Sequence, residues 1–202
     1  MREYIVLDVE TQKLSSEVPG GWGNIAGFGF AVGVVLYVAD YFQATTYHLD
    51  PEVIHPDDWH KAGEFECRTL PVANLIENLH TSPRVVTFNG IRFDYEVLAP
   101  YGLNPTLMTH STFDILRECQ KVLGHRVSLE KVAWATLGIG KSGNATDAPK
   151  WFREGKIEKV MQYCRDDVDI TNRIYQQIIT GNPIYYYDKQ GRKRECKIPP
   201  PQ

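Results

Sequence analysis

The chain has 202 residues, of which 43% are hydrophobic and 23% charged, and this balance suits one compact domain with a sizeable core. The formal net charge of −3 excludes a polycation that binds nucleic acid over its whole surface, so any such contact must come from local basic patches or bound metal. The four cysteines form no CxxC pair, which argues against a zinc ribbon. Since no segment resembles a signal peptide or a membrane span, we expect a cytoplasmic protein with no membrane partner.

The first predicted strand, residues 4–9, is a short run of Val, Ile and Leu that leads into two acids, Asp8 and Glu10. Residues i and i+2 of a strand point to the same side, so the two carboxylates project together, about 7 Å apart along the strand. Like charges repel each other, and one interpretation is a hard divalent cation between them. The alternative is that the acids mark the place where the strand runs into solvent.

The remaining elements predict an α/β fold with a mixed sheet flanked by helices. Apolar runs at 25–38 and 43–49 extend the first strand into a three-stranded antiparallel meander. Helical or strand patterns follow in the order helix 70–80, strand 84–88, helix 93–101, strand 109–113, helix 115–123, helix 129–137, loop 138–149 and helix 156–180. Asp114 and Ser128 are expected to cap the two helices that they precede. We divide the chain into a main domain, 1–183, and a tail, 184–202, which is either a hairpin or a basic, proline-rich arm.

Two further groups of residues could complete a site at the end of the first strand. Strand 84–88 runs into Asn89 and then Asp94, and parallel strands present their carboxyl ends at the same edge of a sheet. Tyr163 and Asp167 are four residues apart and share one face of the last long helix. The alternative interpretations are that Asp94 caps a helix and that Asp167 is an acid at the surface.

Taken in order, Asp8-x-Glu10, Asn89-x-x-x-Phe93-Asp94 and Tyr163-x-x-x-Asp167 resemble the three motifs of the DEDDy 3′–5′ exonucleases, a branch of the ribonuclease H-like superfamily. The resemblance extends from residue 5 to about residue 175. It implies a ribonuclease H-like fold and hydrolysis of phosphodiester bonds with two Mg²⁺ or Mn²⁺ ions, which oxygen ligands favour. It further implies that Asp8 bridges both ions, that Glu10 and Asp167 complete one site, and that Asp94 supports the other through waters.

The resemblance also assigns roles in substrate binding. Tyr163 would orient the attacking water, because a phenol with a pKa near 10 is a poor base at neutral pH. Asn89 and Phe93 would touch the terminal nucleotides, and Thr11 would offer its backbone N–H to the 3′ end. Lys141 belongs to a basic segment before the last helix that either meets the phosphate backbone or is a solvated loop face.

Other side chains are interpreted more simply. Trp22, Phe28 and Phe93 lie near the motifs in sequence and are either aromatic platforms for the terminal bases or ordinary core or loop packing, and for Trp22 and Phe28 we prefer packing. The six histidines show no i, i+4 pair, and we expect them to be exposed or to cap helices.

The leading hypothesis is a metal-dependent 3′–5′ exonuclease that acts on the 3′ end of single-stranded nucleic acid, with DNA favoured. The alternatives are a non-catalytic nucleic-acid-binding or docking module on the same fold, and an RNA-directed exonuclease or an endonuclease. A polymerase, helicase or nuclease partner fits the small size of the chain, although nothing in the sequence names one.

Overall fold

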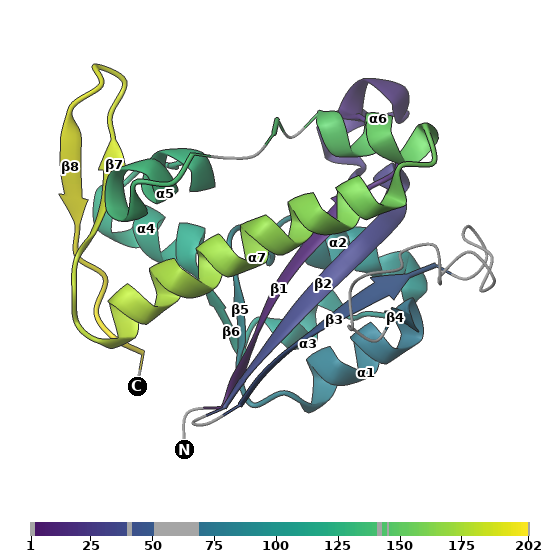
Figure 1. The fold of residues 1–202 in the computed structure, drawn as a ribbon, viewed down its shortest axis with the longest axis horizontal. Coiled ribbons are helices and arrows are strands. Elements are labelled where there is room, and N and C mark those ends of the chain that lie inside the picture. The colour runs from purple at the N-terminus through teal and green to yellow at the C-terminus, as the bar shows by residue number, and fades with distance from the viewer. Residues whose placement is uncertain (1–2, 40–41, 51–68, 141–142, 145, 202) are drawn as a thin grey trace.

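A computed structural model describes residues 3–39, 42–50, 69–140, 143–144 and 146–201. Its centre is a six-stranded sheet in the order β4-β3-β2-β1-β5-β6 (Figure 1). β1 pairs antiparallel with β2, as β2 does with β3, whereas the β1–β5, β5–β6 and β3–β4 pairs are parallel. The strands are β1 (Tyr4–Thr11), β2 (Phe30–Ala39), β3 (Phe42–Leu49), β4 (Thr69–Pro71), β5 (Val85–Thr87) and β6 (Thr112–Asp114). The predicted mixed α/β sheet, with its antiparallel meander and parallel strands, is therefore confirmed.

Helices cover both faces of the sheet, and a separate hairpin follows the last of them (Figure 1). The helices are α1 (Val72–Thr81), α2 (Asp94–Leu98), α3 (Pro105–Met108), α4 (Ile115–Leu123), α5 (Leu129–Leu137), α6 (Asp147–Arg153) and α7 (Ile157–Ile179). The hairpin consists of β7 (Ile184–Tyr187) and β8 (Lys193–Cys196). Asp114 and Ser128 cap α4 and α5 as predicted, since each side chain accepts a hydrogen bond from the backbone N–H three residues further on.

Strand β1 separates two hydrophobic cores. Tyr4 and Val6 face the core that contains α4, α5 and α7, whereas Ile5, Leu7 and Val9 face the core that contains α1 and α2. The long helix α7 lies across β1 and β2 (Figure 1). This alternation decides which side of the sheet receives the acids at the end of β1.

Several details differ from the sequence prediction, which also did not include the short strand β4 and the short helix α3. Residues Ile25–Phe28 form a short 3₁₀ helix instead of the start of a strand, and α6 begins inside the predicted loop 138–149. His48 is fully buried in β3 rather than exposed, with its ring nitrogens close to Thr46 Oγ1 and the Pro71 carbonyl.

The tail forms a hairpin, which is one of the two alternatives predicted for it. The division of the chain after residue 183 stays a prediction. Among the described helices, none combines the length and the apolar character that crossing a membrane requires.

Candidate active site

The first two predicted site residues follow directly from the alternation of β1. Asp8 and Glu10 continue the face of Tyr4 and Val6, so they project towards α7 rather than towards α1. The ladder between β1 and β2 shifts its register between Glu10 and Thr11. Such irregularities bend a strand and redirect its side chains, and they occur often beside functional sites.

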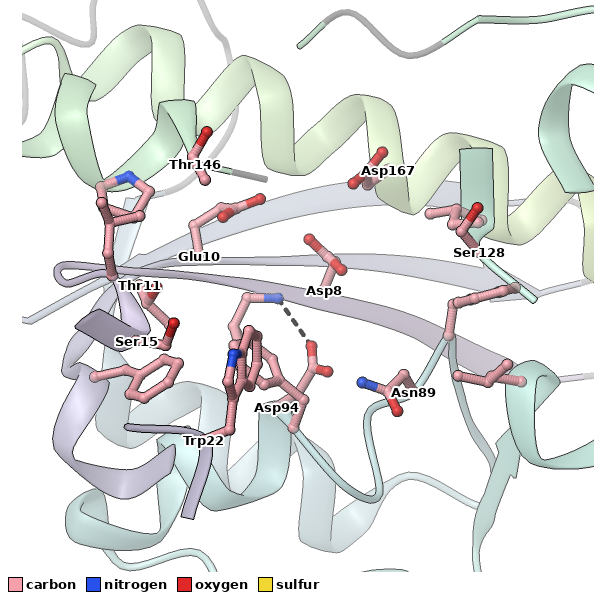
Figure 2. A pocket seen from close by; sticks show the side chains of 18 of the residues that line it. Asp8, Glu10, Thr11, Ser15, Trp22, Asn89, Asp94, Ser128, Thr146 and Asp167 are labelled. Carbon is pink, nitrogen blue, oxygen red and sulfur yellow. Dashed lines mark hydrogen bonds between the residues drawn. The ribbon is translucent and has the colours of Figure 1, made fainter. Parts of the chain in front are cut away.

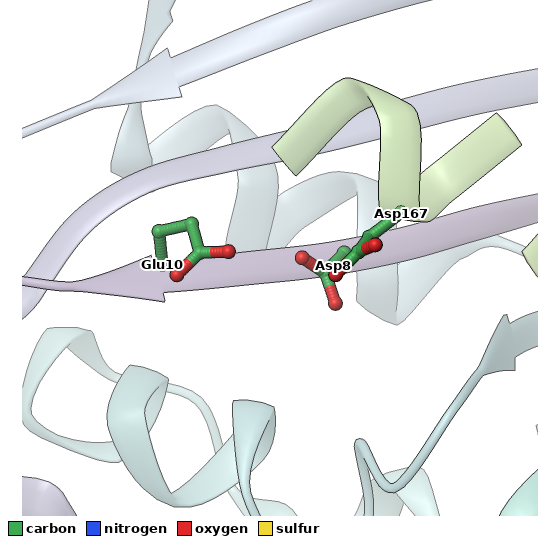
Figure 3. Close-up of side chains that lie close together, drawn as sticks. All are labelled: Asp8, Glu10 and Asp167. Atoms are coloured by element: carbon green, nitrogen blue, oxygen red, sulfur yellow. The ribbon is translucent and has the colours of Figure 1, made fainter. Parts of the chain in front are cut away.

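Asp167 of α7 meets these two acids from above the sheet (Figure 3). One carboxylate oxygen from each of Asp8, Glu10 and Asp167 lies within 4.8 Å of the others, and Asp167 is only 6% exposed. Three negative charges at this spacing repel one another, and burial deprives the Asp167 carboxylate of hydration. A set of carboxylate oxygens without nitrogen or sulfur ligands suits a hard divalent cation, so the three residues could hold a metal ion.

Cys164 supports Asp8 from α7 and was not singled out from the sequence. Its buried thiol donates to the main-chain oxygen of Asp8 at 3.2 Å and lies 3.5 Å from the Asp8 Oδ2 atom. Burial, together with the neighbouring carboxylates, raises the pKa of Cys164 well above its usual value, so the thiol keeps its proton. Cys164 therefore acts as a donor that helps to fix the strand at Asp8.

Asp94 stands apart from the three-carboxylate cluster. Its Oδ1 atom accepts a hydrogen bond of 3.0 Å from the Val9 N–H, drawn as the dashed line in Figure 2. Strand β5 pairs with β1 only at Ile5 and Val6, so the edge of β1 beyond them lacks a strand partner and Asp94 supplies the acceptor at Val9. Burial raises the pKa of Asp94 to about 7.

A second buried acid shapes the turn that precedes Asp94. The carboxylate of Asp114 accepts from the backbone N–H groups of Asn89 at 2.9 Å and Ile91 at 3.2 Å, in addition to capping α4. Asn89 has a φ of 77°, a left-handed conformation that Asn tolerates better than most residues. Its Oδ1 atom accepts a bond of 2.7 Å from the Arg126 guanidinium. Arg126 is thus a cation at the site that no sequence motif indicated.

These residues surround a cavity of about 580 Å³ (Figure 2). The predicted site residues among its lining are Asp8, Glu10, Thr11, Asn89, Phe93, Asp94, Tyr163 and Asp167. Thr11 is buried, and its hydroxyl donates to the Lys13 carbonyl at 3.2 Å. Tyr163 is also buried, with its ring edge-on to Trp151. The structure therefore brings eight of the nine predicted residues to one cavity, and the ninth, Lys141, lies outside the described residues.

Three aromatic rings form one wall of the cavity. The ring centroids of Trp22, Phe28 and Phe93 are 5.4–6.0 Å apart. Phe28 is buried, as expected of a packing residue, whereas Trp22 packs against Phe28 and Phe93 and is still 68% exposed. The inner rings therefore hold an exposed indole at the edge of the cavity.

The mixed sheet, with an acidic cluster where β1 ends beneath α7, defines an α/β class of protein whose site could bind a metal ion. The model of the ribonuclease H superfamily matches residues 64–179, which is more than half of the chain. The chain belongs to the ribonuclease H superfamily. No curated protein matches it. The matched segment contains Asp94, Tyr163 and Asp167, whereas Asp8 and Glu10 precede it. Family and cluster together indicate a nucleic-acid-hydrolysing enzyme.

Proposed function

We propose that this protein is a metal-dependent 3′–5′ exonuclease that removes nucleotides from the 3′ end of single-stranded nucleic acid, with DNA favoured. The observation that carries the proposal is the cluster of Asp8, Glu10 and Asp167, whose carboxylate oxygens lie within 4.8 Å of one another. Tyr163 lines the same cavity, one helical turn before Asp167. The order of the motifs around these residues supports the DEDDy branch of the superfamily.

The donor set fits Mg²⁺ or Mn²⁺. When bound by Asp8, Glu10 and Asp167, with Asp94 beside them, two such ions would acidify the attacking water and stabilise charge on the phosphate and the leaving oxygen. A phenol, whose ordinary pKa is near 10, is a poor base at pH 7, so the role proposed for Tyr163 is to orient the water by hydrogen bonding. Asp94 positions Asp8 and Glu10 by holding the backbone of Val9, which lies between them.

The aromatic wall supports a single-stranded substrate. A base in a duplex is stacked on its neighbours, whereas a base at a free single-stranded end can turn onto a protein ring. Trp22 offers an exposed face at the edge of the cavity, and Phe93 lies beside it at a centroid distance of 6.0 Å. A terminal base on this wall would lie in the same cavity as the carboxylates.

The test compares three DNA substrates with Mn²⁺: a linear 5′-labelled strand, the same strand with a phosphorothioate as its last 3′ linkage, and a circle of the same sequence. We expect a ladder of single-nucleotide steps on the first substrate, a delayed start on the second and no cutting of the circle. The Asp8→Asn variant should be inactive, whereas Asp169→Asn, a change at an exposed acid of the same helix α7, should retain activity. Cutting of the circle as fast as the linear strand would identify an endonuclease, and activity confined to matched RNA would identify an RNA-directed enzyme.

A further inference from the structure

A second hollow of about 550 Å³ lies next to the cavity of the carboxylates. Its walls are the segment between α4 and α5, the start of α5, and the β7–β8 hairpin, which stands beside these helices in Figure 1. Arg126, Val127 and Ser128 line both hollows. The two spaces therefore share one wall, formed by these three residues.

Positive charge dominates this second hollow. Arg126, Lys131 and Lys189 contribute exposed cationic side chains to its lining. Lys131 and Lys189 take part in no ion pair within the described part of the chain. The Arg126 guanidinium is anchored to Asn89, so it stands at the boundary between the two hollows. These three cations offer partners for successive anionic groups.

The acid in the lining, Asp188, is already neutralised by its own turn. Its carboxylate accepts from the backbone N–H groups of Gln190 and Arg192 at 2.9 Å, and from the Nε atoms of Arg192 and Arg194 at 3.0 and 3.1 Å. These bonds, led by the Arg192 N–H, hold the pKa of Asp188 well below its usual range. Asp188 thus organises the turn around Lys189 without cancelling the positive charge beside it.

The hairpin is fixed against the domain. The Thr136 hydroxyl of α5 accepts from the Tyr185 N–H at 2.8 Å and donates to the Tyr185 carbonyl at 2.9 Å. Ile184 and Cys196 are buried in the same core as α7, and the Cys196 thiol contacts Cys119 of α4. The wall that carries Lys189 is therefore built before any ligand arrives, which lowers the cost of ordering it on binding.

We propose that the second hollow is the path of a single nucleic-acid strand on its way to the carboxylates, with the strand's phosphates held by Arg126, Lys131 and Lys189. The proposal rests on the proposed function, because that function defines which polymer enters the first cavity. Cationic grooves that follow a flexible backbone are a general means of binding single strands without reading their sequence. Substrates that extend past the terminal nucleotide should therefore bind more tightly than those that do not.

The experiment measures binding of a fluorescent single-stranded oligonucleotide by anisotropy in EDTA, over a range of salt concentrations, with the full chain. The test variant is Lys131→Ala with Lys189→Ala. The matched control is Lys121→Ala with Lys159→Ala, which removes the same charge from exposed lysines that lie outside both hollows. Each single-strand phosphate contact contributes about 0.7 to the slope of log K against log salt, so the test variant should lose about 1.4 of slope and the control should lose none. An unchanged slope in the test variant, or an equal loss in the control, would overturn the proposal.

A second measurement separates this proposal from the proposed function. The p-nitrophenyl ester of thymidine 5′-phosphate carries one phosphodiester and is too short to leave the first cavity. If the enzyme is a nuclease, the test variant should hydrolyse this ester at the wild-type rate while it degrades long strands with a raised KM. If the wild-type protein hydrolyses neither substrate, the proposed function fails, and the binding slopes still decide whether the hollow holds a strand. Equal KM values for variant and wild type on long strands would contradict the path.

Discussion

Removing one acid of the cluster should stabilise the metal-free protein and abolish its stabilisation by metal. Asp167 lies within 4.8 Å of both Asp8 and Glu10, measured between carboxylate oxygens. At that distance two charges repel by ~1 kcal/mol in bulk water and ~3.5 kcal/mol at an effective dielectric constant of about 20. The Asp167→Asn variant lacks two such repulsions. At the bulk-water value of ~1 kcal/mol for each, its free energy of unfolding in EDTA should be higher by about 2 kcal/mol, which corresponds to a rise in Tm of about 4–8 °C.

Divalent metal should reverse this order. A metal at 100 times its Kd stabilises the wild-type protein by about 2.7 kcal/mol, whereas the variant has lost a ligand and should gain little. Thermal unfolding of both proteins in EDTA and in Mn²⁺ tests the crossover. The control is Asp169→Asn, which removes an exposed acid of α7 whose contact with Arg165 is 4.0 Å long and should contribute less than ~1 kcal/mol. A variant less stable than wild type in EDTA, or equally stabilised by Mn²⁺, would refute the reasoning.

Three further predictions follow from individual contacts. Asp94→Ala leaves the buried Val9 N–H without its acceptor and should cost about 1–3 kcal/mol of unfolding free energy. Asp94→Asn keeps an oxygen at that place, so a loss of activity in this variant at unchanged Tm would measure the contribution of the carboxylate charge. Trp22→Ala should raise KM for single strands by about 5- to 150-fold, equivalent to ~1–3 kcal/mol of stacking, with Tm unchanged because the indole is 68% exposed. Steady-state kinetics that show no change in KM would argue against stacking on Trp22. Burial lowers the pKa of His48 to about 4, so the unfolded chain takes up its proton first and the free energy of unfolding should fall as the pH drops below about 6.5. At pH 5 this loss should be ~2 kcal/mol relative to pH 7.5. Denaturant titrations at the two pH values should show a smaller loss for His48→Gln.

Periodicity accounts for what could be predicted about the site. The alternation of β1 placed Asp8 and Glu10 on one face, and the four-residue spacing placed Asp167 beside Tyr163 on α7. These are local properties of a strand and a helix, so a single sequence contains them. The position of Asp94 at the same site was predicted from the general rule that sites lie at the carboxyl ends of parallel strands.

The remaining features depend on contacts between distant segments. The bond from Val9 to Asp94 exists because β5 is shorter than β1, and no local pattern sets that difference. Arg126 reaches Asn89 across 37 positions of sequence. The exposure of Trp22 on top of Phe28 and Phe93 depends on contacts between these rings, which the sequence alone could not establish. His48 was misjudged because its burial depends on the neighbouring strand β4, which supplies the Pro71 carbonyl.

The most direct test of the central claim is the Mn²⁺ dependence of nucleotide release from a 5′-labelled single strand by wild-type protein and by Asp8→Asn. The claim is that Asp8, Glu10 and Asp167 bind the metal that drives hydrolysis. It predicts stepwise shortening that requires Mn²⁺, that stops in EDTA and that the Asp8→Asn variant loses by at least about 100-fold at every metal concentration, or ~2.7 kcal/mol of transition-state stabilisation. Shortening that persists in EDTA, or a variant as active as wild type, would contradict it.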